Sequence, residues 1–187
     1  MNKIGLYCGT FDPIHFGHIN LALEAFEKKK LDKVLFCPSN ISPKKVNNPP
    51  KASGQDRLAM LKLALDDLPC FEICDVEIAR GGISYTVDTV REIKGLYPGD
   101  ELRLIIAADS FPGFSSWKNC SDILEKAPPI VGLRKGFDRP PVEFDVMNNK
   151  VLEISSSDIR SRLKKNLYSA HLLHIKVLDY IYKHGLY

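Results

Sequence analysis

Two histidines separated by a phenylalanine and a glycine lie near the start of the chain, at His15-Phe16-Gly17-His18. They follow the uncharged apolar run from Ile4 to Cys8, which is typical of a buried strand, and a break at Gly9. After them, apolar residues recur at helical spacing from Ile19 to Phe26. The imidazoles therefore lie at the first turn of a helix, where free N–H groups and the positive end of the dipole bind anions. These residues predict a phosphate-binding corner with two additional proton-carrying donors.

The spacing of the two histidines also carries a family signal. Residues three positions apart project from one face of a helix, and Gly17 between them leaves room for a ligand to approach the backbone. The segment Gly9–His18 resembles the H-x-G-H signature of the nucleotidyltransferases related to class I aminoacyl-tRNA synthetases. The alternative is that both histidines only cap helix backbone groups, but the strand before them and the glycine between them favour phosphate binding.

The elements that must position these residues alternate between strands and helices. Strands are predicted over 34–37, 71–76, 104–108 and 130–133, a polar loop over 41–52, and helices near 53–68, 85–93, 155–160 and 172–181. This order predicts an α/β fold in which residues 1–187 form a single doubly wound, Rossmann-like parallel sheet with helices on both faces. Ligands bind beyond the carboxyl ends of such strands, so we expect Thr10, Ser39, Asp109 and Arg134 to meet in one crevice.

Composition and charge exclude several classes of protein. The 187 residues are 44% hydrophobic and 26% charged, and the formal net charge of +3 is too weak to indicate binding of nucleic acid or of an anionic membrane. No apolar run is long enough to span a membrane, and the N-terminus resembles no signal peptide. The sequence carries no signal for an oligomeric state.

The five cysteines include no C-x-x-C pair and are odd in number, which argues against a disulfide or zinc framework. Cys8 and Cys37 fall in apolar strands, where a cysteine acts as a small core residue. This pattern indicates a reducing, cytoplasmic location.

Further segments extend the family resemblance over nearly the whole chain. Besides Gly9–His18, they are 56–61, 84–89, 108–110 with Trp117, 154–160 and 180–187, and together they resemble the bacterial nicotinate mononucleotide adenylyltransferases. The resemblance implies that the chain transfers AMP from ATP to nicotinate mononucleotide in NAD biosynthesis, giving nicotinate adenine dinucleotide and pyrophosphate. Attack in line on the α-phosphorus, without a covalent enzyme intermediate, suits a site that is rich in hydrogen-bond donors.

The resemblance also implies roles for particular residues. His15 and His18 would be catalytic, and the ATP site would comprise Gly9, Thr10, Phe11, His15, His18, Asp109, Ser156 and Arg160. The second nucleotide would be held by Ser84, Tyr85, Thr86, Trp117, Lys44 and Arg134. Mg²⁺ is expected only through the ATP phosphates, with no metal site built from protein ligands.

The acid form of the second nucleotide is expected from residues 84–86. They follow a Gly-Gly break and open a helix, so their unpaired backbone N–H groups would face a nicotinate carboxylate. Trp117 would lie against the positively charged pyridinium ring. The alternative is that residues 84–86 only cap the helix and that Trp117 belongs to the core.

Departures from the family pattern affect this second subsite. A family histidine is replaced by Lys44, a methyl group is added at Ala107, Lys118 follows the tryptophan, and residues 81–83 differ. Other hypotheses therefore remain: an adenylyltransferase that prefers the amide nucleotide or phosphopantetheine, a non-catalytic nucleotide-binding module, or a tRNA-binding fragment. A fragment of the last kind would need a broad basic face, which this chain lacks.

Overall fold

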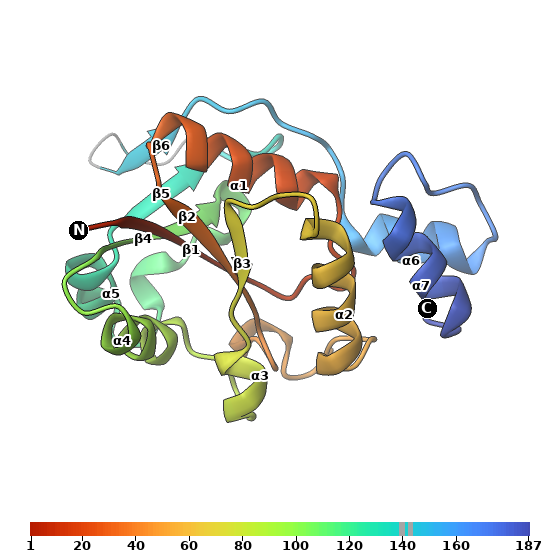
Figure 1. Cartoon of the computed structure of the whole chain (residues 1–187), viewed down its shortest axis with the longest axis horizontal. Helices are drawn as coiled ribbons and strands as arrows, with labels where there is room; N and C mark the ends of the chain where they lie inside the picture. Colours follow the sequence, from red (N-terminus) through yellow and green to blue (C-terminus); the bar gives the residue numbers. More distant parts are fainter. Residues whose placement is uncertain (139–140, 142–143) are drawn as a thin grey trace.

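The computed structural model describes residues 1–138, 141 and 144–187. Its centre is a six-stranded sheet in the order β3-β2-β1-β4-β5-β6, and every strand pair in it is parallel (Figure 1). The strands are β1 (Lys3–Gly9), β2 (Lys33–Pro38), β3 (Phe71–Ile73), β4 (Glu101–Ala107), β5 (Pro129–Gly132) and β6 (Asp145–Met147). Because β2 and β3 lie on one side of β1 and β4 to β6 on the other, the direction of winding switches between β1 and β4. A ligand crevice is expected at such a switch point.

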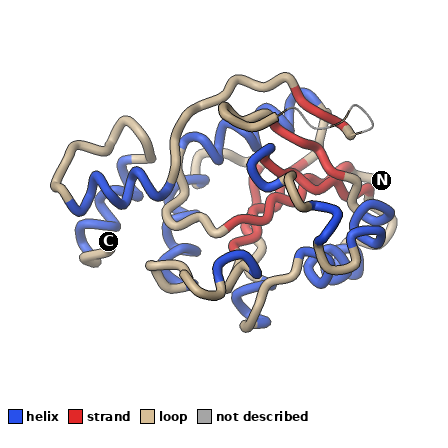
Figure 2. The backbone as a smooth tube through the Cα atoms, turned by 180° about the vertical axis from the view of Figure 1, so that it is seen from behind, coloured by secondary structure: helices blue, strands red, loops and turns tan. Residues whose placement is uncertain are grey.

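Helices cover both faces of the sheet, as the α/β prediction requires (Figure 2). They are α1 (Phe16–Lys28), α2 (Gly54–Leu65), α3 (Val76–Arg80), α4 (Thr86–Leu96), α5 (Cys120–Lys126), α6 (Ser156–Lys164) and α7 (Ile175–Lys183). Apolar residues of α1, α2, α6 and α7 pack into one core layer and those of α4 and α5 into the other. Among the described residues, no helix combines the length and apolar character needed to cross a membrane.

Successive side chains along the central strands point alternately into these two core layers. In β1, Leu6 faces the layer of α4 and α5, whereas Tyr7 faces the layer of α1 and α2. Both are buried, which explains why the sequence of β1 is apolar throughout rather than alternating.

One predicted strand is wrong in its extent, and three elements (α3, α5 and β6) were not predicted. The run 71–76 alternates like a strand, but β3 ends at Ile73, and Val76 is the first residue of α3. Six alternating residues do not distinguish a strand from a short strand followed by a helix. Neither β6, with three residues, nor α5, with seven, is long enough to show a clear period.

Candidate active site

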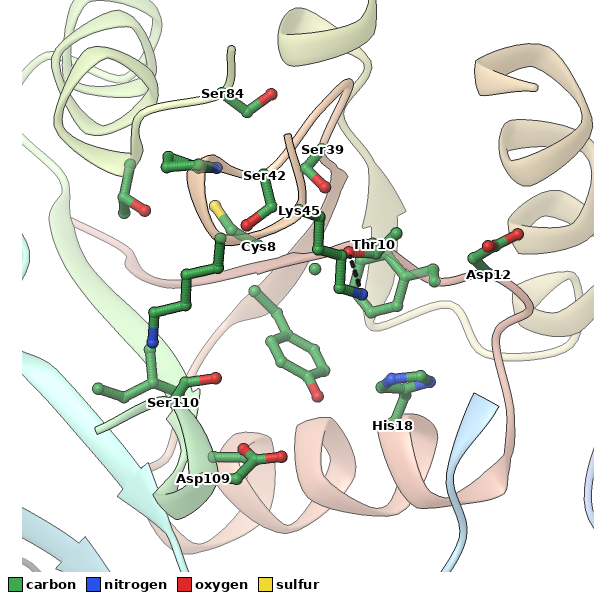
Figure 3. A pocket seen from close by; sticks show the side chains of 18 of the residues that line it. Cys8, Thr10, Asp12, His18, Ser39, Ser42, Lys45, Ser84, Asp109 and Ser110 are labelled. Carbon is green, nitrogen blue, oxygen red and sulfur yellow. Dashed lines mark hydrogen bonds between the residues drawn. The ribbon is translucent and has the colours of Figure 1, made fainter. Parts of the chain in front are cut away.

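A pocket of about 610 Å³ opens at the carboxyl ends of the central strands (Figure 3). It is lined by every residue for which a binding role was predicted: Gly9, Thr10, Phe11, His15, His18, Lys44, Ser84, Tyr85, Thr86, Asp109, Trp117, Arg134, Ser156 and Arg160. Segments up to about 150 residues apart in the sequence therefore meet at the predicted crevice. The structure brings these residues together, whereas the role of each one stays a prediction.

The two histidines form a stacked pair at the start of α1. Their ring centroids are 3.6 Å apart, and the planes are inclined by 23°. The backbone amide of His15 donates to Nδ1 of His18 at 3.3 Å, so the proton of the neutral His18 ring resides on Nε2. A Cβ atom on Gly17 would lie 3.0 Å from Nδ1 of His15, and glycine therefore permits the stack. The Phe11 ring packs edge-on against His18 and is almost fully buried, so that contact to a ligand would come from its backbone.

Burial keeps both imidazoles neutral. It lowers the pKa of His15 to about 3 and the pKa of His18 well below its usual value. At His18, the repulsion that a protonated His15 would exert and the positive charges of Arg134 and Lys45 add to the effect of burial. Each ring therefore offers one N–H donor rather than a full positive charge. A bound phosphate would favour the charged form, because an anion nearby stabilises an imidazolium.

The low pKa of His15 predicts that stability depends on pH. Between about pH 6.5 and 3 the unfolded chain binds a proton at this residue and the folded chain does not. The free energy of unfolding should therefore fall as the pH falls through this window, by on the order of 1 kcal/mol per pH unit for one histidine. Urea unfolding of the native chain and of His15→Asn, measured at pH 5 and pH 7, checks this. Equal pH dependence in the two proteins would contradict it.

The loop between β1 and α1 is anchored by Asp12, to which no role was assigned from the sequence. Its buried carboxylate accepts from the amides of Lys51 at 2.8 Å and Ala52 at 3.1 Å, and from the Tyr187 hydroxyl at 2.7 Å. Arg160 donates to the Asp12 carbonyl at 2.7 Å. The phosphate corner is thus held from three other parts of the chain.

Arg57 also anchors loops of the pocket, and the sequence analysis did not identify it as a site residue. Its side chain is 1% exposed and donates to the carbonyls of Thr10 at 2.9 Å, Ser39 at 2.5 Å and Asn40 at 3.3 Å. It therefore ties the loop after β1 to the loop after β2. The sequence signals for Arg57 were its place in the segment 56–61, which resembles the family, and its position beside the apolar stripe of α2.

Helix α6 brings two predicted phosphate ligands to the edge of the pocket. Ser155 caps this helix by accepting from the Asp158 amide. The Ser156 hydroxyl donates to the Pro13 carbonyl at 2.9 Å, so a phosphate there would be met by backbone N–H groups of the first turn. Arg160 keeps further N–H donors beyond its bond to the loop.

Two more charged groups occur on opposite walls. Lys45 was not predicted as a site residue, yet its Nζ donates to the Thr10 hydroxyl at 3.0 Å inside the pocket (Figure 3). Burial lowers its pKa. Asp109, expected to accept from a ribose hydroxyl, pairs with Arg134 at 3.0 Å. A ribose would therefore compete with Arg134 for this carboxylate.

The expectation of unpaired amides at residues 84–86 is wrong for Ser84. Its amide donates to the Ile41 carbonyl at 2.8 Å, and its hydroxyl accepts from the Asn40 amide at 2.9 Å. Ser84 thus fastens the loop after β2. Within the described part of the chain, the amides of Tyr85 and Thr86 donate to no protein acceptor, as expected at the start of α4.

Trp117 is both partly core and part of the pocket wall. Its ring packs against Phe114 at 5.0 Å between centroids, and among the described residues its buried Nε1 has no hydrogen-bond partner. Lys44 Nζ lies 5.8 Å from the Trp117 ring centre, and Lys118 Nζ lies 4.5 Å from that of Tyr85. Two of the family departures therefore place cations beside the aromatic rings of the second subsite.

Comparison with known proteins assigns the chain to a family. The model of the cytidylyltransferase-like family matches residues 6–162. A "Probable nicotinate-nucleotide adenylyltransferase" of Dictyoglomus thermophilum is 41% identical over 99% of both chains, and one of Carboxydothermus hydrogenoformans is 38% identical over 99% of this chain and 98% of its own. The solved nicotinic acid mononucleotide adenylyltransferase of Plasmodium falciparum, complexed with NaAD, shares the fold with a TM-score of 0.84 at 20% identity, covering 100% of this chain and 97% of that one. The chain therefore belongs to the cytidylyltransferase-like family and groups with its nicotinate-nucleotide adenylyltransferases.

Proposed function

We propose that this protein transfers AMP from ATP to nicotinate mononucleotide. A 5′-phosphate oxygen of the mononucleotide forms a bond to the α-phosphorus of ATP. The bond from that phosphorus to the bridging oxygen of the β-phosphate breaks, and pyrophosphate leaves. The products are nicotinate adenine dinucleotide and pyrophosphate.

The observation that carries this proposal is that the first turn of α1, which carries His18, and the first turn of α6 reach the same pocket. The Nε2–H donor of His18 lies in the pocket at the start of α1, while the first turn of α6 reaches the same pocket with Ser156 and Arg160. These groups are donors that suit phosphate oxygens on which negative charge grows. In-line transfer of this kind depends on positioning and charge stabilisation, and it needs no protein nucleophile.

The carboxylates of the pocket fit a magnesium ion that arrives with ATP. In the described lining of the pocket, the carboxylates of Asp12, Glu77 and Asp109 all have protein partners. Such a set favours an ion held mainly by phosphates and water. When bound, Mg²⁺ would offset charge on the β- and γ-phosphates, which His15, His18 and Arg160 would position.

The five cysteines are free thiols, which supports a reducing cytoplasm as the place of action.

The test is release of pyrophosphate from ATP with three acceptors in parallel: nicotinate mononucleotide, nicotinamide mononucleotide and phosphopantetheine. We expect rapid release with the first. Preference for either of the others would assign the chain to a sister adenylyltransferase. ATP binding without release from any acceptor would indicate a nucleotide-binding module.

Arg160→Lys should weaken the binding of ATP by about 10- to 100-fold and leave the binding of AMP nearly unchanged. The lysine keeps the charge but loses the planar fork that meets phosphate with two parallel bonds. Isothermal titration with both nucleotides measures this. The matched control is Arg162→Lys, since Arg162 lies on the same helix but donates to the Tyr168 carbonyl, outside the pocket lining. Equal loss for ATP and AMP would show that Arg160 does not contact the β- and γ-phosphates.

A further inference from the structure

Three cysteines and a glutamate gather beneath the pocket from four separate elements. Cys8 and Cys37 are register partners near the ends of β1 and β2, and both belong to the core layer of α4 and α5. Cys74 follows β3, and its amide donates to the Phe36 carbonyl at 2.9 Å, which places it beside the end of β2. Glu77 enters from α3. The Sγ atoms of Cys8 and Cys37 and a carboxylate oxygen of Glu77 all lie within 4.8 Å of one another.

The Glu77 carboxylate is the charged group of this cluster. The Glu77 side chain is 2% exposed, and it accepts from the Thr89 hydroxyl at 2.6 Å. A carboxylate buried this deeply needs partners of this kind, because an unpaired buried charge is costly. The two thiols within 4.8 Å of this carboxylate, those of Cys8 and Cys37, make the cluster unusually polar for a core layer.

We propose that Cys8, Cys37, Cys74 and Glu77 form a binding site for a thiophilic divalent cation of the Zn²⁺ class. Sulfur and carboxylate ligands of a tetrahedral zinc ion lie about 4 Å from one another, so modest side-chain rotation closes Cys8, Cys37 and Glu77 around an ion. Cys74, which lies beside the end of β2, would supply the fourth ligand. Cys8 and Glu77 both line the nucleotide pocket, which provides the entry path (Figure 3 shows Cys8).

Binding at this site would release one proton to solvent for each thiol that becomes a thiolate ligand. Without metal, Cys37 belongs to the core layer of α4 and α5 and Cys8 and Cys74 pack against it, so the three thiols behave as small core residues. The sequence predicted no zinc framework, because the ligands are separated by 29, 37 and 3 positions. The parallel sheet brings them together by aligning the ends of three strands.

Cobalt titration of the reduced, metal-free full-length protein tests the site, since Co²⁺ replaces Zn²⁺ and reports its ligands by colour. We expect one equivalent to bind, with a sulfur-to-cobalt charge-transfer band in the near ultraviolet, release of protons in unbuffered solution, and displacement by Zn²⁺. Cys37→Ser should lower the affinity at least ~10-fold, because ligand loss exceeds the effect of losing an outer-shell partner. Thermal melting of the variant shows whether it is folded, and Cys74→Ser provides a second, less buried substitution.

The chain supplies matched controls in Cys70 and Cys120, which lie outside the cluster. Cys70→Ser and Cys120→Ser should keep the band and the affinity of the native protein. A band of native intensity and an unchanged affinity in both Cys37→Ser and Cys74→Ser, or the absence of any band in the native protein, would overturn the proposal. So would loss of two hydrogen masses on mild oxidation, localised to Cys8 and Cys37, in a protein that binds no metal, because the cluster would then be a redox pair. None of these readouts involves nucleotide transfer, so the result is independent of the proposed function.

Discussion

His18→Ala is expected to lower kcat by about 10²- to 10³-fold while weakening ATP binding much less. The size of this decrease in kcat follows from the loss of one preorganised hydrogen-bond donor, which faces the charge that develops in the transition state. The ring is held for this purpose: Nδ1 accepts from the His15 amide, Phe11 packs against one edge, and the His15 ring stacks on its face. His15→Ala should also be severe, but more through positioning of ATP, because His15 forms the other half of the stack.

Two conservative variants separate a donor role from a structural one. His18→Gln places an amide N–H near the position of Nε2, whereas His18→Asn reaches only the position of Nδ1. We expect Gln to recover part of the turnover and Asn to recover none, with pyrophosphate release as the measurement. His171→Ala is the control, since His171 stacks on Tyr168 outside the pocket. Native turnover per folded molecule in His18→Ala, together with a lower Tm, would instead make His18 a structural residue.

The parts of this site that were predictable from sequence are those encoded by neighbours in the chain. The β1–α1 corner is a strand, a break and a helix start within residues 4–18, and each has a local signature. The alternation of strands and helices predicts the parallel sheet, and the parallel sheet then requires that the strand ends meet. From the meeting of the strand ends alone, Asp109 and Arg134 were predicted to share a crevice with His18, and all three line the same pocket.

What could not be predicted are contacts between residues that share no local pattern. Arg57 is a helix residue whose three carbonyl partners belong to two other loops. Asp12 receives its bonds from positions about 40 and 175 residues away. Ser84 looked like a helix opener with a free amide, but the loop after β2 takes both of its bonds. In each case a buried polar group needs a partner, and only the folded chain determines which one it finds.

The second subsite should discriminate strongly between the acid and the amide form of the mononucleotide. We expect kcat/KM for nicotinate mononucleotide to exceed that for nicotinamide mononucleotide by at least ~10², since a site with fixed polar groups rejects a mismatched partner better than shape alone. The free amides of Tyr85 and Thr86 would donate to the carboxylate of the acid form, whereas the amide form would turn its own NH₂ donors toward one of them. The cations of Lys44 and Lys118, beside the rings of Trp117 and Tyr85, would attract the carboxylate of the acid form more than the neutral amide group.

A pair of substitutions at Thr86 isolates the backbone donor. Thr86 is the first residue of α4, where proline is tolerated, and Tyr85 before it is extended at φ −87° and ψ 126°, as a residue preceding proline must be. Thr86→Pro therefore removes one N–H while keeping the helix, and we expect it to reduce the acid-to-amide ratio by about 10-fold, the loss of one hydrogen bond to a charged group. Thr86→Ala keeps the N–H and should leave the ratio unchanged, whereas Trp117→Ala should raise KM for both nucleotides. Steady-state kinetics with both mononucleotides measures these ratios. Near-equal kcat/KM for the two mononucleotides in the native protein would make it a dual-specificity enzyme. The same acid-to-amide ratio of kcat/KM in Thr86→Pro and Thr86→Ala would mean that groups other than the Thr86 amide discriminate between them.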